Sequence, residues 1–336
     1  ILRFSVSCNW FLKGKEHGPV ARRIDFLFMV ALIAGAGTGL GFSTPMIAEC
    51  LTWLFGVEHT YELEVWVMAV CVSLFVFSVW LGLQKGIKRL SDINLFLAFG
   101  LLLFILFAGP TLFLVKTSLN GLGLMTQNFV RMNFWTDPFT RSGFVEDWTI
   151  FYWAWWVAFA PYVGLFITRI SRGRTIKQVI KGMLIYGSLG CWVFYMIIGN
   201  FSMFQQLNEH VDVLGVMNTV GAPAAIVATL ESAPLAPAVI AVFTLMSIIF
   251  AATTYDSASY TLASSATLHL SAGEDPARWH RVFWAFALAV LPITLLFVGG
   301  LETIKVMLLI TSTPILVVGV FMSYSLVKSL QHDIPE

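Results

Sequence analysis

Long apolar segments alternate with short polar ones along the whole of the 336-residue chain. A helix needs about 20 mostly apolar residues to cross the hydrocarbon core of a bilayer. Eight segments meet this requirement, at 24–46, 63–83, 92–115, 148–168, 180–203, 237–263, 280–299 and 303–328. The pattern predicts an all-α polytopic membrane protein with about eight transmembrane helices.

Two shorter segments, 47–56 and 118–135, mix apolar and polar residues. We expect amphipathic helices there, lying on the membrane surface or packed on the bundle. The small residues at 35–41 permit either close helix packing or local unwinding in the first span. Gly109 and Pro110 predict a kink late in the third span.

Composition supports the membrane assignment, because 58% of the residues are hydrophobic and only 12% are charged. A soluble domain carries roughly 25% charged residues. The net charge of +1 does not indicate the basic surface that binding to nucleic acid requires. The chain has neither a P-loop nor an HExxH motif, so we expect no enzyme and no cofactor. Its histidines fall in loops or at helix ends, where we expect solvated residues.

The basic residues predict how the chain is oriented. With eight spans, both ends of the chain lie on one side of the membrane. Of the 20 Lys and Arg residues, all but Lys116, Arg131, Arg141 and Lys305 fall on that side. Because Lys and Arg are enriched in cytoplasmic loops, both ends are predicted to be cytoplasmic.

The fourth span opens with a dense group of aromatic residues. Trp155, Phe159 and Tyr162 follow an i, i+4, i+7 spacing and share one helix face, and Trp153 and Trp156 form an adjacent face. Faces of this kind suit a quaternary ammonium group, which has no N–H donor and is held by aromatic rings. Helix packing combined with an aromatic belt at the membrane interface is the alternative, and the pattern leaves both open.

The sixth span carries hydroxyls and a carboxylate in an apolar helix. Thr253, Thr254 and Ser257 lie on overlapping turns and, with backbone carbonyls, could coordinate a small hard cation. Equally, such hydroxyls often bond back to the preceding turn. Asp256 is costly inside a membrane, so we expect it to face a partner and to orient neighbouring helices.

These stretches resemble a known family, the betaine/choline/carnitine transporters. The resemblance rests on Trp153-Ala-Trp155-Trp156, on Arg169-Ile-Ser-Arg172-Gly-Arg174-Thr175, and on the shorter runs 82–87 and 147–152. It implies a twelve-helix secondary transporter of LeuT-like fold built from two inverted repeats. The eight spans then correspond to family helices 5–12 of an N-terminally truncated chain. Residues 1–135 would be a partial first repeat with an amphipathic helix, and 136–336 the second repeat with a short C-terminal tail.

The resemblance also implies roles for individual residues. Trp156 matches the tryptophan that closes the substrate box, Trp155 lies beside it, and Phe159 matches the next aromatic of the pathway. Trp153 and Tyr162 complete the candidate substrate site. On the sixth span, the resemblance implies a sodium site formed by Phe250, Thr253 and Thr254.

Three positions bear on ion coupling. Asn94 stands where the carnitine antiporters of the family carry a fixed arginine, which favours sodium coupling. Leu32 and Ala36 stand where a second sodium site would place threonines, which speaks against a second ion.

The sequence therefore predicts sodium-coupled uptake of a quaternary ammonium or sulfonium osmolyte, such as glycine betaine or dimethylsulfoniopropionate. A sodium-independent carnitine/betaine exchanger is the alternative, and a non-transporting sensor or channel is a third. We expect a bacterial inner-membrane location. A homotrimer is expected by analogy, since 118–135 resembles the family's helix at the trimer centre.

Overall fold

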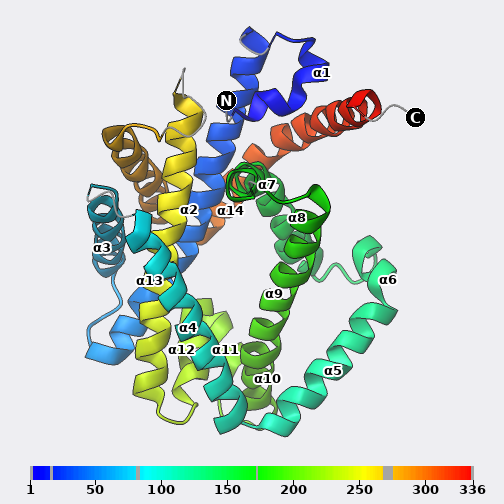
Figure 1. The fold of residues 1–336 in the computed structure, drawn as a ribbon. Helices are drawn as coiled ribbons and strands as arrows, with labels where there is room; N and C mark the ends of the chain where they lie inside the picture. The colour runs from blue at the N-terminus through cyan, green and yellow to red at the C-terminus, as the bar shows by residue number, and fades with distance from the viewer. Residues whose placement is uncertain (1–2, 16–17, 81–83, 172, 268–274, 334–336) are drawn as a thin grey trace.

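The computed structural model describes residues 3–15, 18–80, 84–171, 173–267 and 275–333, and these residues form helices without a strand (Figure 1). The N-terminal part contains a short 3-10 helix Phe4–Cys8, α1 Asn9–Leu12, α2 Pro19–Phe55, α3 Tyr61–Trp80, α4 Gln84–Ala108, α5 Thr111–Gln127 and α6 Phe129–Phe134. The remainder contains a π-helical turn Val145–Ile150, α7 Phe151–Ile170, α8 Ile176–Gly182, a π-turn Met183–Gly187, α9 Ser188–Phe194, a π-turn Tyr195–Gly199, α10 Asn200–Leu207, α11 Val213–Thr219, α12 Ala222–Glu231, α13 Ala236–Ala266 and α14 Arg278–Asp333.

Seven helical segments among the described residues are long and apolar enough to cross a membrane, and they confirm seven of the expected spans. They are Pro19–Phe55, Arg89–Ala108, Val145–Thr168, Ile176–Leu207, Ala236–Ala266, Arg278–Val298 and Glu302–His332. The expected span at 63–83 corresponds to α3, and its last residues, 81–83, lie outside the described residues.

Helix α2 is longer than the sequence predicted. The separate amphipathic helix expected at 47–56 is wrong, because α2 continues through Pro45 to Phe55. A proline removes one backbone hydrogen bond, but the turns on either side of it can keep theirs. Ile47, Ala48 and Cys50 are fully buried, so this part of α2 packs on the bundle.

The kink expected at Gly109 and Pro110 is a complete break. Helix α4 ends at Ala108 and α5 begins at Thr111, whose hydroxyl donates to the carbonyl of Leu106 over 2.6 Å. Helices α5 and α6 cover the segment 118–135 that was expected to be helical, and they extend away from the rest of the molecule at the lower right of Figure 1.

The last two expected spans join into one helix. Helix α14 contains 56 residues and includes Pro292 and Pro314. A straight helix of this length would measure roughly 84 Å, about twice the thickness of a bilayer with its headgroups. In Figure 1 its first part (brown) and its last part (red) run in different directions, as proline kinks allow.

Helices α2 and α13 lie at the centre of the bundle and contact each other, and α2 also packs against α3, α7 and α14. The small residues of α2 make these contacts close. A Cβ atom added to Gly37 would lie 3.6 Å from Leu291 and Pro292 of α14. The run 35–41 is helical throughout, so its small residues serve helix packing rather than unwinding.

Candidate functional site

One face of α7 is packed against α2. The indole N–H of Trp155 donates to the carbonyl of Gly35 over 3.2 Å, and the Trp155 ring stacks on Phe42 at 5.9 Å between centroids. The ring of Phe159 lies so close to Gly35 that an added Cβ would come within 3.1 Å of it. Tyr162 is buried and contacts Phe159, with 4.7 Å between ring centroids. Trp155, Phe159 and Tyr162 therefore form one continuous inner face.

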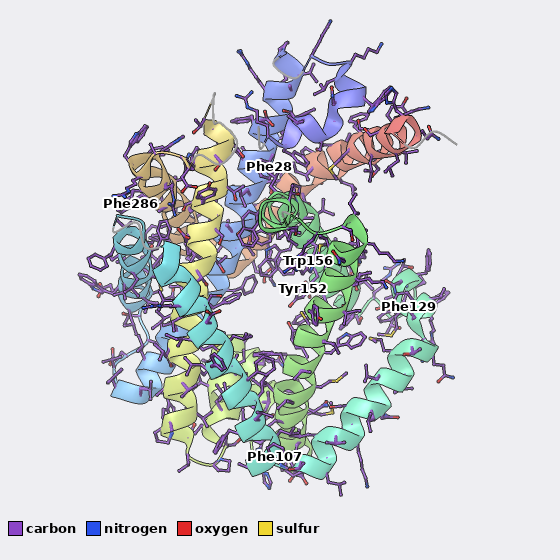
Figure 2. The ribbon with its side chains drawn as sticks, in the orientation of Figure 1. Phe28, Phe107, Phe129, Tyr152, Trp156 and Phe286 are labelled. Atoms are coloured by element: carbon purple, nitrogen blue, oxygen red, sulfur yellow. The ribbon has the colours of Figure 1, made fainter. Side chains whose placement is uncertain are left out.

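The other two tryptophans of the candidate substrate site lie on an outer face of α7. Trp153 is 63% exposed and Trp156 is 57% exposed. Figure 2 shows Trp156 and Tyr152 on the side of α7 that faces the centre of the view. The structure thus separates the five predicted residues into two groups, and it does not close them into one box.

The predicted ion motif lies on α13. The hydroxyl of Thr253 donates to the carbonyl of Phe250 over 3.0 Å, so two of the three expected ligand oxygens are already in contact. Thr254, which would supply the third oxygen, is half-buried on the same turn. The Phe250 side chain is exposed, but only its carbonyl is needed as a ligand. This hydrogen bond is what a purely structural Thr253 would make, although the hydroxyl oxygen keeps two lone pairs that could still contact an ion.

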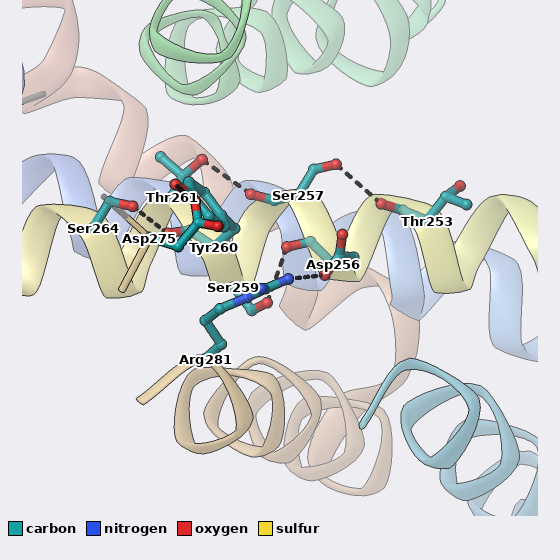
Figure 3. A network of polar contacts seen from close by, with 9 residues as sticks. All are labelled: Thr253, Asp256, Ser257, Ser259, Tyr260, Thr261, Ser264, Asp275 and Arg281. Atoms are coloured by element: carbon teal, nitrogen blue, oxygen red, sulfur yellow. Dashed lines mark hydrogen bonds and ion pairs between the residues drawn. The ribbon is translucent and has the colours of Figure 1, made fainter. Parts of the chain in front are cut away.

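The hydroxyl row continues along α13. Ser257 donates to the carbonyl of Thr253 over 3.1 Å, and Thr261 donates to that of Ser257 over 2.9 Å (Figure 3). Helix α13 also packs against α7, and Tyr162 of α7 belongs to the same buried cluster as Tyr255 and Ala258 of α13. The inner face of α7 therefore borders the helix that carries the hydroxyl row.

Asp256 forms an ion pair, as expected for a carboxylate that would be costly to bury alone inside a membrane. The guanidinium Nη2 of Arg281, in the first turn of α14, donates to its Oδ1 over 2.7 Å. Both residues are buried, and the guanidinium also lies over the ring of Tyr260, 5.1 Å from the centroid. The sequence places Arg281 only among the basic residues of the predicted cytoplasmic side, and its spacing from Asp256 along the chain gives no signal of this contact.

Three further positions bear on ion coupling, namely Leu32, Ala36 and Asn94. Leu32 and Ala36 are buried in the core of α2 and carry no hydroxyl that could bind an ion. Asn94 on α4 has a buried Oδ1 that meets no hydrogen-bond donor within the described part of the chain. No group of three or more His, Cys, Asp or Glu residues among the described residues could hold a metal.

The arginine-rich run after α7 forms a capped turn. The Thr175 hydroxyl accepts from the Gln178 N–H over 3.3 Å, and Gln178 Oε1 accepts from the Thr175 N–H over 3.0 Å, which is a capping box at the start of α8. Gly173 has a φ of 84°, a conformation that favours glycine. Arg172 lies outside the described residues.

His59 lies in the exposed loop between α2 and α3, as the sequence predicts, and there it contacts two carboxylates. Its Nδ1 contacts Glu49 of α2, and its Nε2 lies 3.1 Å from Glu64 of α3. Burial lowers the pKa of His59, but the hydrogen bonds to the two carboxylates outweigh it and raise the pKa above its ordinary value. This cluster ties α2 to α3 beside the connection between them.

An all-helical bundle with seven helical segments long and apolar enough to cross a membrane among the described residues defines a multi-pass helical membrane protein. The family model of the betaine/carnitine/choline transporters matches residues 2–335. The chain belongs to this family, whose fold is LeuT-like.

Two relatives are similar over nearly the whole chain. "Uncharacterized transporter YeaV" of Escherichia coli is 33% identical over 320 residues, which cover 95% of this chain and 66% of the relative. "Carnitine transporter" of Acinetobacter baumannii is 33% identical over 323 residues, which cover 95% of this chain and 58% of the relative. The chain thus spans about three fifths of the length of these curated relatives.

Proposed function

We propose that the protein takes up a quaternary ammonium or sulfonium osmolyte, glycine betaine or dimethylsulfoniopropionate, and couples this uptake to sodium. Membership of the family supports an onium substrate. A trimethylammonium group cannot donate a hydrogen bond, so aromatic rings are its natural partners. Trp156 is the residue we assign to the onium group, with Trp153, Trp155, Phe159 and Tyr162 along the path.

The single observation that carries sodium coupling is the packing of α13, which carries the candidate ion motif, against α7, which carries the aromatic face. Ser257 lies one turn after Thr253 and bonds to its carbonyl. An ion held by the Phe250 carbonyl and by the hydroxyls of Thr253 and Thr254 would therefore influence the aromatic face of α7 directly. Sodium is a co-substrate in this proposal, not a resident metal.

Sodium-independent exchange is the second candidate, and two observations favour it. One relative is named a carnitine transporter. The Thr253 hydroxyl also donates to the Phe250 carbonyl, as a purely structural hydroxyl would. Against exchange, Asn94 carries no charge that could replace an ion. The buried cation of Arg281 is neutralised by Asp256 and is not a free substitute either.

The repeat boundaries, the membrane location and the oligomeric state are also proposed from the resemblance to the family. Residues 1–135 would belong to the first inverted repeat and 136–336 to the second. The protein would lie in a bacterial inner membrane with both ends cytoplasmic, which agrees with the basic residues. A homotrimer formed through 118–135 is supported by the exposed apolar side chains of α5 and α6, such as Leu119, Phe129 and Phe134.

Uptake in proteoliposomes tests the coupling. Labelled glycine betaine uptake is measured with and without an inward sodium gradient, for the wild type and for Thr253→Ala/Thr254→Ala. We expect uptake to require sodium, and the double variant to need about tenfold more of it. Thr311→Ala is the matched control, because its hydroxyl bonds back to Met307 on α14 in the same way. Equal uptake without sodium, driven by internal substrate, would establish the exchanger instead.

A further inference from the structure

The connection between α2 and α3, at the left of Figure 1, runs from Gly56 to Thr60. Gly56 has a φ of 67°, a left-handed conformation that favours glycine, and it ends α2. His59 contacts Glu49 of α2 through its Nδ1, and its Nε2 lies 3.1 Å from an oxygen of Glu64 on α3. The two ring nitrogens therefore face carboxylates from two different helices.

This arrangement selects the protonated ring. A neutral imidazole carries one N–H, so it can donate to one of the two carboxylates and directs a lone pair at the other. Only the imidazolium donates to both Glu49 and Glu64 at once. Hydrogen bonds to ionised groups are also stronger than those between neutral groups. The contacts that His59 makes between α2 and α3 are thus complete only while the imidazole carries its proton.

Other charged groups around this corner have partners of their own or face water. Helix α14 packs against both α2 and α3, and its Lys305 pairs with Glu302 over 2.7 Å. Helix α13 packs against the same two helices, and its Asp256 pairs with Arg281. Three more carboxylates, on the connection, the first turn of α3 and the end of α12, are exposed, namely Glu58, Glu62 and Glu231. The imidazole is therefore governed by the two carboxylates that it contacts.

The charge of His59 changes within the pH range of ordinary buffers. Its side chain is 29% exposed, so protons reach it from water. Burial by itself would lower the pKa of His59, but the hydrogen bonds and charges of Glu49 and Glu64 outweigh this effect and raise the pKa above its ordinary value of 6.5. A contact of this kind stabilises fully below about pH 6.5, and its contribution is lost as the pH rises through the raised pKa of the folded state.

We propose that His59 is a pH-sensitive clasp, which joins α2 to α3 while its ring is protonated, releases them as the pH rises, and slows transport while it is closed. The clasp reaches a third helix, because the hydroxyl of Tyr61 donates to the carbonyl of Ile293 on α14 over 3.1 Å. The ring of Tyr61 also packs against Phe297, with 5.5 Å between centroids. The inference goes beyond sodium coupling, and it rests on the proposed function only for the identity of the substrate.

The closed clasp acts on transport through the movement of helices. Alternating access moves one group of helices against another. A contact that is made in the arrangement of Figure 1 favours that arrangement, by at most its own free energy. Because His59, Glu49 and Glu64 join α2 to α3, their contact opposes any step in which the two helices separate. Protonation should therefore slow uptake, and deprotonation should speed it.

The first test is the stability of the full-length protein, unfolded in mixed detergent and SDS micelles. The wild type is compared with His59→Gln, which has no titrating ring, at about pH 6 and about pH 9. Between these pH values we expect the ratio of folded to unfolded protein to fall about fivefold more in the wild type than in His59→Gln, the scale of one partly exposed ion pair. A variant with the same pH dependence as the wild type overturns the clasp.

The second test is uptake of labelled glycine betaine at saturating sodium, in proteoliposomes with the same pH inside and outside, so that no proton gradient forms. Betaine itself does not titrate here, because its quaternary ammonium holds no proton and a carboxylate titrates well below this range. Relative to His59→Gln, we expect wild-type uptake to be up to about fivefold slower at about pH 6 than at about pH 9. Glu64→Gln removes one carboxylate and should move the midpoint of the profile about one pH unit lower.

His210→Gln is the matched control. His210 lies in another exposed loop, after α10, and its Nδ1 lies 2.9 Å from the amide oxygen of Gln205, an uncharged group. This variant should keep the pH profile of the wild type in both tests.

The outcomes separate this inference from the proposed function. A full-length protein that does not transport glycine betaine overturns the proposed substrate, while the unfolding measurement still tests the clasp. If the clasp is seen in unfolding but the wild type and His59→Gln share one uptake profile, the regulatory role is overturned and His59 only ties the helices together. Wild-type uptake that is faster in acid than that of His59→Gln overturns it as well.

Discussion

Helix α7 presents aromatic side chains on two faces, and the two faces have opposite surroundings. On the inner face, Trp155 donates to the Gly35 carbonyl and Phe159 packs onto Gly35 itself. On the outer face, Trp153 and Trp156 are more than half exposed. Aromatic residues occur on both faces, but those of the inner face are buried or half-buried against the rest of the bundle.

This difference teaches which aromatic residues are available to a ligand. A side chain that is already packed and hydrogen-bonded has little surface left to offer a substrate, and its replacement changes stability first. An exposed indole keeps its π-face free for a cation. We therefore expect substitutions on the inner face to change stability and substitutions on the outer face to change substrate affinity.

The largest effect is expected at the centre of the inner face. Phe159→Ala removes the ring that lies against Gly35 and Tyr162. Deleting a packed Phe side chain leaves a cavity, and we expect a loss of about 3 kcal/mol in the free energy of unfolding. Unfolding in mixed detergent and SDS micelles measures this loss.

Phe166→Ala is the control on the same helix, because Phe166 is 40% exposed. It should cost less than about 1 kcal/mol, as substitutions at exposed positions usually do. Equal losses for the two variants would mean that the inner face is no better packed than its surroundings, and the comparison would fail.

The outer face is expected to govern substrate affinity. Trp156→Ala should raise the KM for glycine betaine by up to about 30-fold, the equivalent of a desolvated cation–π contact of about 2 kcal/mol. Trp156→Phe retains a ring and should lose less. Trp153→Ala removes an equally exposed indole, and we expect a rise of about threefold. Uptake kinetics at saturating sodium measure all three variants, and a Trp156→Ala variant with wild-type KM would remove Trp156 from the site.

Much of the fold follows from the apolar pattern of the sequence, since seven of the predicted spans appear among the described residues as helical segments long and apolar enough to cross a membrane. Helix boundaries were less predictable. Pro45 does not end α2, whereas Gly109 and Pro110 end α4 completely. A proline can lie within a helix or end it, depending on the side chains that pack around it. Those contacts cannot be read from the local sequence.

In the candidate site, too, local features could be predicted from the sequence but contacts between helices could not. The spacing of Trp155, Phe159 and Tyr162 correctly predicts one shared face, because helical periodicity is local. The partner of Asp256 could not be predicted, since Arg281 lies 25 residues further along the chain and reads as an ordinary basic residue at a membrane boundary. Likewise, His59 meets two carboxylates from two different helices. Contacts between helices depend on their rotation and tilt, which periodicity does not determine.

The smallest expected effect isolates one hydrogen bond of the inner face. Trp155→Phe keeps an aromatic ring to stack on Phe42 but removes the N–H that donates to the Gly35 carbonyl. A single neutral hydrogen bond contributes about 1 kcal/mol, and we expect a loss of that size in the free energy of unfolding. Trp148→Phe, at an exposed position of the preceding turn, provides the control and should change it little. If both variants match the wild type, the inner face is held by the shape of the rings against α2 alone. A loss only in Trp155→Phe would show that the carbonyl of Gly35 fixes the indole, and with it the rotation of α7 that turns Trp156 outward.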